Sequence, residues 1–312
     1  MTYYQSTINE VVSIILEKKL PYENTIIIGN NSSGKSELLK RLLLKSGFEH
    51  WYLIDSVNRY FNIGQIFKRL EKTSHIQFSE KIVEHRLKED NYNLKDTFYY
   101  GGVPSEIENF YFDFEPEIKR LVKDFLGVEL EIRQSEVDFR LYLDGIESCL
   151  SSGYQALLRI FIEMEYIRQT MKTGTIVIDE IDEFLFAYNC ARIFEFLRQE
   201  YKNFTFIVTT HSADLIANAL TSNLVMLSEG AYELLDAGDF NSVSQVYNIF
   251  NSIFYDRKAM SDKEMIDVAL RKLLNNKVAG IWREEDSNEL LSIKGEVLTK
   301  AQRVLIRQIE EW

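Results

Sequence analysis

The sequence is poor in residues that break or cross-link a chain. Its 312 residues include only 3 prolines and 2 cysteines. The shortage of proline, beside abundant phenylalanine and tyrosine, argues against long disordered linkers, which are rich in proline and poor in aromatic side chains. The two cysteines, Cys149 and Cys190, do not make a disulfide scaffold and lack metal-site spacing, so we expect a reducing compartment.

Long apolar runs are also missing. No stretch approaches the length that spans a bilayer. The first residues lack the basic and apolar segments of a secretory signal peptide. We therefore expect a cytoplasmic protein that does not contact a membrane.

Acidic residues outnumber basic ones, 48 to 36, and the formal net charge is −12. Nucleic-acid-binding surfaces are normally basic, so such a surface would have to be a local patch here. The charged stretch 66–95 reads as helical, and we interpret it first as a solvated helix face. The alternative is a nucleic-acid contact through six basic residues among acidic neighbours: Lys68, Arg69, Lys72, Lys81, Arg86 and Lys88.

The stretch 29–36, GNNSSGKS, has the pattern of a phosphate-binding P-loop. An apolar run before it predicts a buried strand, and the run after it predicts a helix. Backbone N–H groups and the helix N-terminus would bind phosphate, Lys35 would reach the β- and γ-phosphates, and Ser36 would ligate Mg²⁺. The alternative is a plain polar turn. The candidate nucleotide contacts are Gly29, Asn30, Asn31, Ser32, Ser33, Gly34, Lys35, Ser36 and Glu37.

A second apolar run, 175–178, ends in two acids with the pattern called Walker B. We expect Asp179 to hold Mg²⁺ and Glu180 to orient or deprotonate the attacking water. The alternative is a strand that ends in ordinary surface acids. A third buried strand is predicted at 205–212 and ends in Thr-Thr-His-Ser, which includes His211.

The segment Leu150–Gln155, LSSGYQ, opens a predicted helix that runs to about Thr170. Ser151, Ser152 and Gly153 at its N-terminus would form a second anion-binding cradle. The alternative is a helix that Ser151 or Ser152 simply caps.

These four motifs, in this order, resemble those of ABC-type ATPases related to SMC, RecF and OLD proteins. The resemblance implies an α/β P-loop NTPase fold: an ABC-type head with a mostly parallel core sheet, a helical lobe around the signature LSSGYQ, and a helical C-terminal tail. It also implies ATP and Mg²⁺ as cofactors, and a head-to-tail dimer in which the signature of one subunit, including Gln155, meets ATP on the P-loop of the other. The implied catalytic residues are Lys35, Glu180 and His211, and the implied metal ligands are Ser36 and Asp179.

The chain departs from this class in several places. It has no coiled-coil arms, only an insert at about 60–126. The region after the ATPase motifs lacks the acidic strand motifs of the Toprim domain found in OLD nucleases, so we expect any nuclease to be another protein. The glutamine that senses Mg²⁺ in the class is not obvious; Asn58 and Gln65 are candidates, and Arg59 is a candidate nucleotide contact. We divide the chain into an ATPase domain, 1–240, and a helical region, 241–312, expected to dock a partner.

The sequence also resembles small prokaryotic ATPases of anti-phage systems such as retrons, Septu, PARIS and OLD nucleases. We therefore expect an ATP-hydrolysing subunit that regulates a separate effector, a nuclease or toxin, with DNA or RNA bound through that partner. One alternative is a DNA-repair or chromosome-associated ATPase that acts on DNA directly. Another is the ATP-binding subunit of a membrane transporter.

Overall fold

The structure is a computed structural model. It describes residues 3–57, 59–66, 76–95, 97–135, 138–228, 230–240, 242–246, 266–267, 269–270, 273–274, 276–277 and 282–311. The chain divides into two compact units, Met1–Asp239 and Phe240–Trp312. Each unit is described by itself.

The first unit is built on a six-stranded sheet with the order β11-β10-β1-β9-β8-β2. Neighbouring strands are parallel except for the antiparallel pair β10 and β11. This confirms the predicted α/β fold with a mostly parallel core sheet. The strands are β1 (Thr25–Gly29), β2 (Trp51–Ile54), β8 (Gly174–Ile178), β9 (Phe204–Thr209), β10 (Asn223–Ser228) and β11 (Ala231–Asp236). The sequence analysis did not predict β10 and β11.

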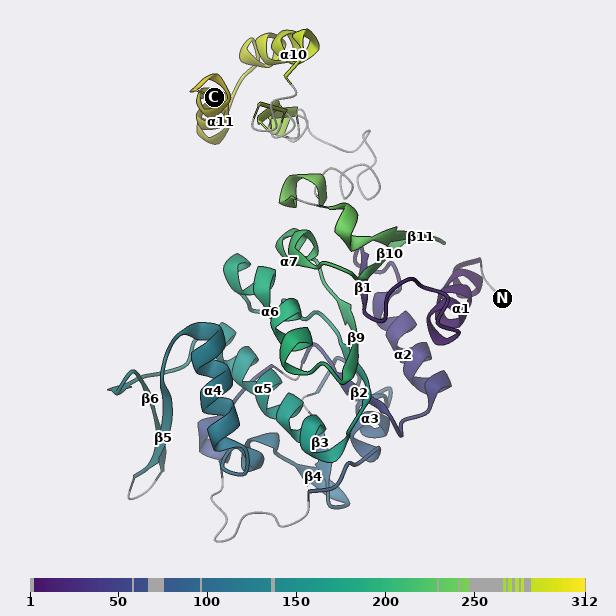
Figure 1. The fold of residues 1–312 in the computed structure, drawn as a ribbon, viewed down its shortest axis with the longest axis vertical. Helices are drawn as coiled ribbons and strands as arrows, with labels where there is room; N and C mark the ends of the chain where they lie inside the picture. Colours follow the sequence, from purple (N-terminus) through teal and green to yellow (C-terminus); the bar gives the residue numbers. More distant parts are fainter. Residues whose placement is uncertain are drawn as a thin grey trace. The chain divides into compact units, whose positions relative to one another are not determined.

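Helices cover both faces of this sheet (Figure 1). Such covering explains why the parallel strands read as continuous apolar runs, since neither face meets water. One side carries α1 (Tyr3–Leu16) and α2 (Lys35–Ser46), and the other carries α5 (Ser152–Thr170) and α6 (Ala187–Glu200). The short helix α7 (Ala213–Asn218) follows β9.

Helix α5 is the centre of the lobe that carries LSSGYQ. Every residue from Ala156 to Ile167 is buried, including three with charged side chains. Helix α4 (Glu115–Leu126) packs against it. The lobe also holds a three-stranded antiparallel sheet of β5 (Leu130–Gln134), β6 (Phe139–Leu143) and β7 (Ile146–Glu147). The lobe around LSSGYQ, expected to be helical, is therefore a mixture of helices and strands.

The charged stretch 66–95 is not one long helix in its described part. Residues 76–95 contain a single short helix, α3 (Lys81–Arg86), followed by turns. Beyond it lie the hairpin of β3 (Phe98–Tyr100) and β4 (Val103–Ser105) and the 3₁₀ turns η1 (Ile63–Gln65) and η2 (Ile107–Phe110). Three residues of the suggested basic patch, Lys68, Arg69 and Lys72, lie outside the described residues.

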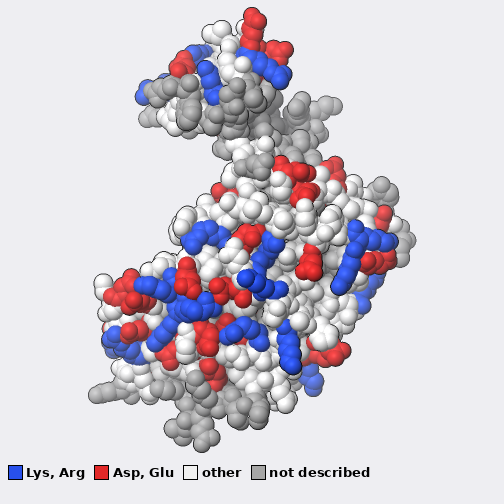
Figure 2. Space-filling model, in the orientation of Figure 1, with Lys and Arg blue, Asp and Glu red and all other residues white. Residues whose placement is uncertain are grey.

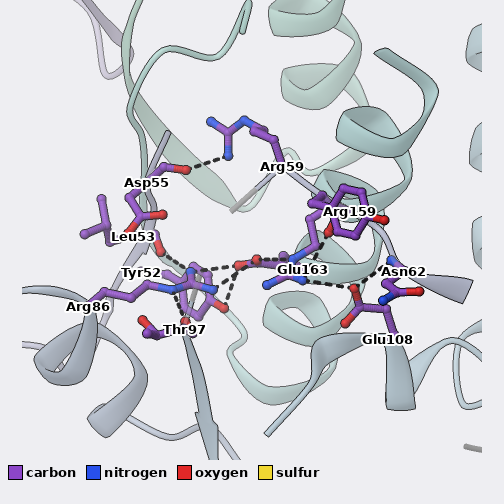
Figure 3. Close-up of polar contacts among 11 residues, drawn as sticks. Tyr52, Leu53, Asp55, Arg59, Asn62, Arg86, Thr97, Glu108, Arg159 and Glu163 are labelled. Carbon is purple, nitrogen blue, oxygen red and sulfur yellow. Dashed lines mark hydrogen bonds and ion pairs between the residues drawn. The ribbon is translucent and has the colours of Figure 1, made fainter. Parts of the chain in front are cut away.

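Arg86 corrects the basic-patch interpretation directly. Its side chain is completely buried and forms an ion pair with Glu163 of α5 at 2.9 Å. A second guanidinium, that of Arg159, donates to the same carboxylate at 3.0 Å, and the Tyr52 hydroxyl donates to it at 2.8 Å. Figure 3 shows these donors converging on Glu163. Arg86 is therefore a core residue and cannot belong to a surface that binds nucleic acid.

The other N–H groups of Arg86 and Arg159 donate hydrogen bonds to neighbouring elements. Arg86 donates to the carbonyl oxygens of Leu53 and Thr97, and Arg159 reaches Glu108 at 3.3 Å. Burial alone would raise the pKa of Glu163, but the two guanidinium groups outweigh burial and hold that pKa below its ordinary value. The carboxylate is therefore ionised, and it links α5 to β2 and α3 inside the core.

We predict that Glu163→Ala lowers the free energy of unfolding by about 3–5 kcal/mol, because it leaves two guanidinium groups buried without their carboxylate. Urea unfolding followed by circular dichroism measures this loss. The matched control is Glu147→Ala, which removes an exposed carboxylate paired with Arg140 and should cost under about 1 kcal/mol. Similar losses in the two variants would contradict a structural role for the cluster.

The second unit has an apolar core of its own. Helices α10 (Glu284–Lys294) and α11 (Lys300–Glu311) lie in it. Among the described residues, the buried apolar side chains of this core are Leu270, Leu273, Leu290, Ile293, Ile306 and Ile309. Among the residues that the structure describes, no helix has the length and apolar character needed to cross a membrane.

Candidate functional site

The P-loop sequence lies at the carboxyl end of β1, in the middle of the sheet. Gly29 is required here by close packing, because a Cβ atom would lie 2.6 Å from the carbonyl oxygen of Leu227 on β10 and 2.3 Å from Ser33 Oγ. The loop turns through positive φ at Ser32 (67°) and Gly34 (101°), and α2 begins at the next residue. Asn30, Asn31 and Ser32 are exposed.

Lys35 folds back over this loop. Its ammonium donates to the carbonyl oxygens of Gly29 at 2.8 Å and Asn30 at 3.2 Å. Burial lowers the pKa of Lys35, while the nearby carboxylates of Asp179 and Glu180 act in the opposite direction. The structure thus holds a cation within the curled backbone, as phosphate binding requires. Glu37 points elsewhere, since its carboxylate pairs with Arg41 at 2.6 Å.

Asp179 brings the predicted metal ligands together. Strand β9 separates β8 from β1, yet Ser36 Oγ donates to Asp179 Oδ2 across 3.1 Å. The carboxylate is buried and has two further donors, Thr209 from β9 to Oδ1 and Asn93 Nδ2 to Oδ2 at 2.9 Å. The sequence analysis missed Asn93, because no motif marks it, and gave Thr209 no role.

These groups fit a magnesium ion. A serine hydroxyl and a carboxylate are hard oxygen ligands, and Mg²⁺ in nucleotide sites takes one or two such groups beside water and phosphate oxygens. Within the described residues, no group of three or more His, Cys, Asp or Glu side chains could form an all-protein metal cage. Ser36 and Asp179 would therefore hold the ion together with phosphate, as the P-loop arrangement requires.

Glu180 has an unusual environment. Its backbone lies at φ +53°, and its N–H donates to Thr209 Oγ1 at 2.6 Å. Burial, a hydrogen bond with Glu183 and the neighbouring Asp179 carboxylate together raise the pKa of Glu180 to about 7. A carboxylate of this basicity suits proton transfer near neutral pH.

His211 lies beside Glu180, with 4.0 Å between its Nε2 and Glu180 Oε1. Burial and the Lys35 ammonium lower the pKa of His211, so a neutral imidazole is favoured. The structure thus brings Lys35, Ser36, Asp179, Glu180 and His211 to one edge of the sheet, because the strands before them are parallel neighbours.

The sequence analysis named three further candidate contacts, Arg59, Gln65 and Asn58. Arg59 is buried and donates to the backbone oxygens of Asp55 at 2.9 Å and Asp179 at 2.8 Å. These contacts join the ends of β2 and β8 and do not support the suggested nucleotide contact. Gln65 is exposed on η1, and Asn58 lies outside the described residues.

The LSSGYQ segment forms the N-terminus of α5. The hydroxyl of Ser151 caps the helix by accepting from Tyr154 N at 3.4 Å, and Gln155 Nε2 donates to Leu150 O at 3.1 Å. Ser151 and Ser152 are exposed, whereas Gly153 is buried, and a Cβ there would lie 2.9 Å from the carbonyl oxygen of Phe184. Ser151 therefore caps α5, and the hydroxyls of Ser151 and Ser152 are exposed at the helix N-terminus.

The turn after Glu180 packs against this helix end and exposes aromatic rings. Phe184, Phe186 and Tyr188 are 53%, 78% and 70% exposed. An open groove of about 600 Å³ runs between α4 and this segment, and Phe186, Tyr188 and Tyr154 line it. Apolar rings gathered beside a helix N-terminus are typical of a surface that contacts another protein.

The solved structures named below share little sequence identity with this chain. The sequence matches no protein-family model and no curated protein. An SMC head domain from Thermotoga maritima is 16% identical, with a TM-score of 0.37 over 69% of this chain and 90% of that chain. A metal-chelate type ABC transporter in an inward-facing conformation is 15% identical, with a TM-score of 0.38 over 76% of this chain and 79% of that chain.

A third solved structure is an Smc head bound to the C-winged helix domain of ScpA. It is 17% identical, with a TM-score of 0.31 over 41% of this chain. The present chain spans only 44% of that chain's length. The P-loop NTPase fold assigned here rests on the strand order and on the placement of the motifs at the sheet edge.

We predict that Gly29→Ala lowers the free energy of unfolding by about 1–3 kcal/mol, because the new methyl group collides with backbone of β10 and forces a shift. Thermal and urea unfolding measure the loss. The control is Asn31→Ala in the same loop, which changes an exposed side chain and should stay within about 0.5 kcal/mol of the parent. Equal stability of the parent and Gly29→Ala would show that the loop does not pack as described.

Proposed function

We propose that this protein binds ATP with Mg²⁺ and hydrolyses it in a head-to-tail dimer. The observation that carries the proposal is the meeting of the P-loop, Ser36 and Asp179 at one edge of the sheet, with Glu180 and His211 beside them. Curled backbone N–H groups, a lysine and a helix N-terminus form a site for polyphosphate. The neighbouring Glu180 carboxylate supplies a base for the attacking water, and the His211 imidazole supplies a hydrogen-bond donor.

Each residue then has a separate role. Lys35, which donates to P-loop carbonyl oxygens in this structure, would turn to the β- and γ-phosphates. Ser36 and Asp179 would hold Mg²⁺, and the bound ion would supply positive charge to the phosphates. Glu180 orients the attacking water and accepts its proton. His211, neutral and adjacent to Glu180, donates a hydrogen bond toward the γ-phosphate.

The dimer is proposed because the two serines of LSSGYQ are exposed at a helix N-terminus. Ser151 and Ser152 lie at the N-terminus of a 19-residue helix, where the macrodipole favours an anion. In the head-to-tail arrangement, Ser152 and Gly153 of one subunit meet the γ-phosphate held by Lys35 of the other. ATP then stabilises the dimer, because only the dimer contains the complete site.

We predict that Glu180→Gln lowers the hydrolysis rate at least about 100-fold and traps an ATP-bound dimer, because it removes the base and keeps the binding groups. Phosphate release and light scattering after gel filtration with ATP measure the two effects. Glu200→Gln, at the far end of α6, is the control and should behave like the parent. If Glu180→Gln stays monomeric with ATP and hydrolyses at the parental rate, the assignment of Glu180 is wrong.

A mixing experiment tests the shared site. Lys35→Met disables the P-loop, and Ser152→Glu places a charge that suits a helix N-terminus but repels phosphate. Each variant alone should be inactive. In an equal mixture, half of the dimers are mixed and each has one intact site, so activity should return to about one quarter of the parental value. A mixture that remains inactive, with both variants folded, would contradict the head-to-tail arrangement.

We further propose that the ATPase cycle regulates a separate effector, a nuclease or toxin, in a prokaryotic anti-phage system. The motif resemblance supports this context, and the second unit, with its own apolar core, is the proposed partner-docking region.

Direct DNA binding receives less support, because blue and red side chains intermingle on the face seen in Figure 2 and Arg86 is buried. Purification of the tagged protein from native cells, followed by mass spectrometry, tests for the effector.

A further inference from the structure

A turn of the insert reaches the nucleotide site. In this turn, which follows α3, Leu94 N donates to Asn91 O at 2.9 Å. Asn91 is itself held, since its amide donates to the carbonyl oxygen of His85 at 2.8 Å. The Tyr92 hydroxyl donates to the carbonyl oxygen of Ser36 at 2.9 Å. The turn is therefore fixed both to α3 and to the first turn of α2.

Asn93 lies in this turn with φ +52°, a left-handed conformation that asparagine tolerates better than most residues. Its side chain faces Asp179, and its NH₂ group donates a hydrogen bond to that carboxylate. The contact is 2.9 Å, to the same oxygen that accepts from Ser36. The amide oxygen, Oδ1, is buried and has no hydrogen-bond partner among the described residues.

We infer that Asn93 is a magnesium-positioning residue, supplied by the insert rather than by the motifs. Its NH₂ orients the Asp179 carboxylate, and its amide oxygen accepts hydrogen bonds from the water that Mg²⁺ keeps in protein sites. A buried acceptor beside two metal ligands gains such a partner when the ion arrives. This inference rests on the proposed function, because the ion enters with the nucleotide.

The geometry also weighs against a purely structural role. Backbone hydrogen bonds within the turn and the Tyr92 hydroxyl already hold the turn in place without the Asn93 side chain. The Asn93 amide therefore adds little to folding of the turn, and its hydrogen bond acts on Asp179, whose carboxylate it stabilises and orients.

The test uses the full-length protein and a fluorescent ATP analogue, titrated in EDTA and at increasing Mg²⁺. Asn93→Gly removes the amide and accepts φ +52° without strain. We expect about a tenfold rise in the Mg²⁺ concentration needed for half-maximal binding, and affinity in EDTA within about twofold of the parent.

The chain offers a matched control in its second unit. Asn276 Nδ2 donates to Asp286 Oδ1, also at 2.9 Å, so Asn276→Ala removes a similar contact far from the motifs in sequence and should leave both titrations unchanged. If Asn93→Gly keeps the parental Mg²⁺ dependence, or loses affinity equally with and without Mg²⁺, the inference is overturned while ATP binding stands. If the parent itself binds no nucleotide, the proposed function fails and this inference fails with it.

Discussion

The carboxylate of Asp179 is the group on which the candidate site depends. It stands at the end of a buried strand, where an anion is costly unless donors surround it. The fold meets this cost with Ser36 from the P-loop helix, Thr209 from the neighbouring strand and Asn93 from the insert. The hydrogen bonds that stabilise the carboxylate therefore also bring the proposed metal ligands together. Structural stability and the proposed nucleotide chemistry would depend on the same atoms.

A similar requirement governs the core around α5. This helix is buried over most of its length, yet it carries Arg159 and Glu163. Their charges are acceptable only because Arg86, Tyr52 and Glu108 supply opposite charge or hydrogen bonds (Figure 3). The helix that presents LSSGYQ at one end is thus tied by buried ionic contacts to β2 and α3. Its orientation relative to the sheet is specified by polar geometry as well as by apolar packing.

The proposed dimer follows from how the two anion-binding elements differ. The P-loop includes Lys35, and its Ser36 contacts the Asp179 carboxylate of the same chain. The LSSGYQ end of α5 offers exposed serines instead, and its close packing is with the turn at Phe184. Exposed aromatic rings on that turn give the same region an apolar surface that a second subunit would cover. In the proposed dimer, each ATP site would therefore combine the P-loop of one subunit with the LSSGYQ segment of the other.

The sequence alone determined the elements whose signals are local. Continuous apolar runs identified the parallel strands β1, β8 and β9, and the glycines and serines between strand and helix identified the P-loop, because these patterns reflect backbone geometry over a few residues. The same reasoning missed the hairpin of β10 and β11 and read too long a helix into 66–95.

Tertiary structure decided what depends on residues far apart in the chain. Nothing near Asn93 in the sequence marks it, since its role arises only when a turn of the insert meets the end of β8. Arg86 looks like a surface charge among charged neighbours and is instead buried against Glu163 of α5, because α3 packs on β2 and β3. Long-range pairing of this kind has no sequence period, so a motif can name the ligands of a site but not the residues that hold them in position.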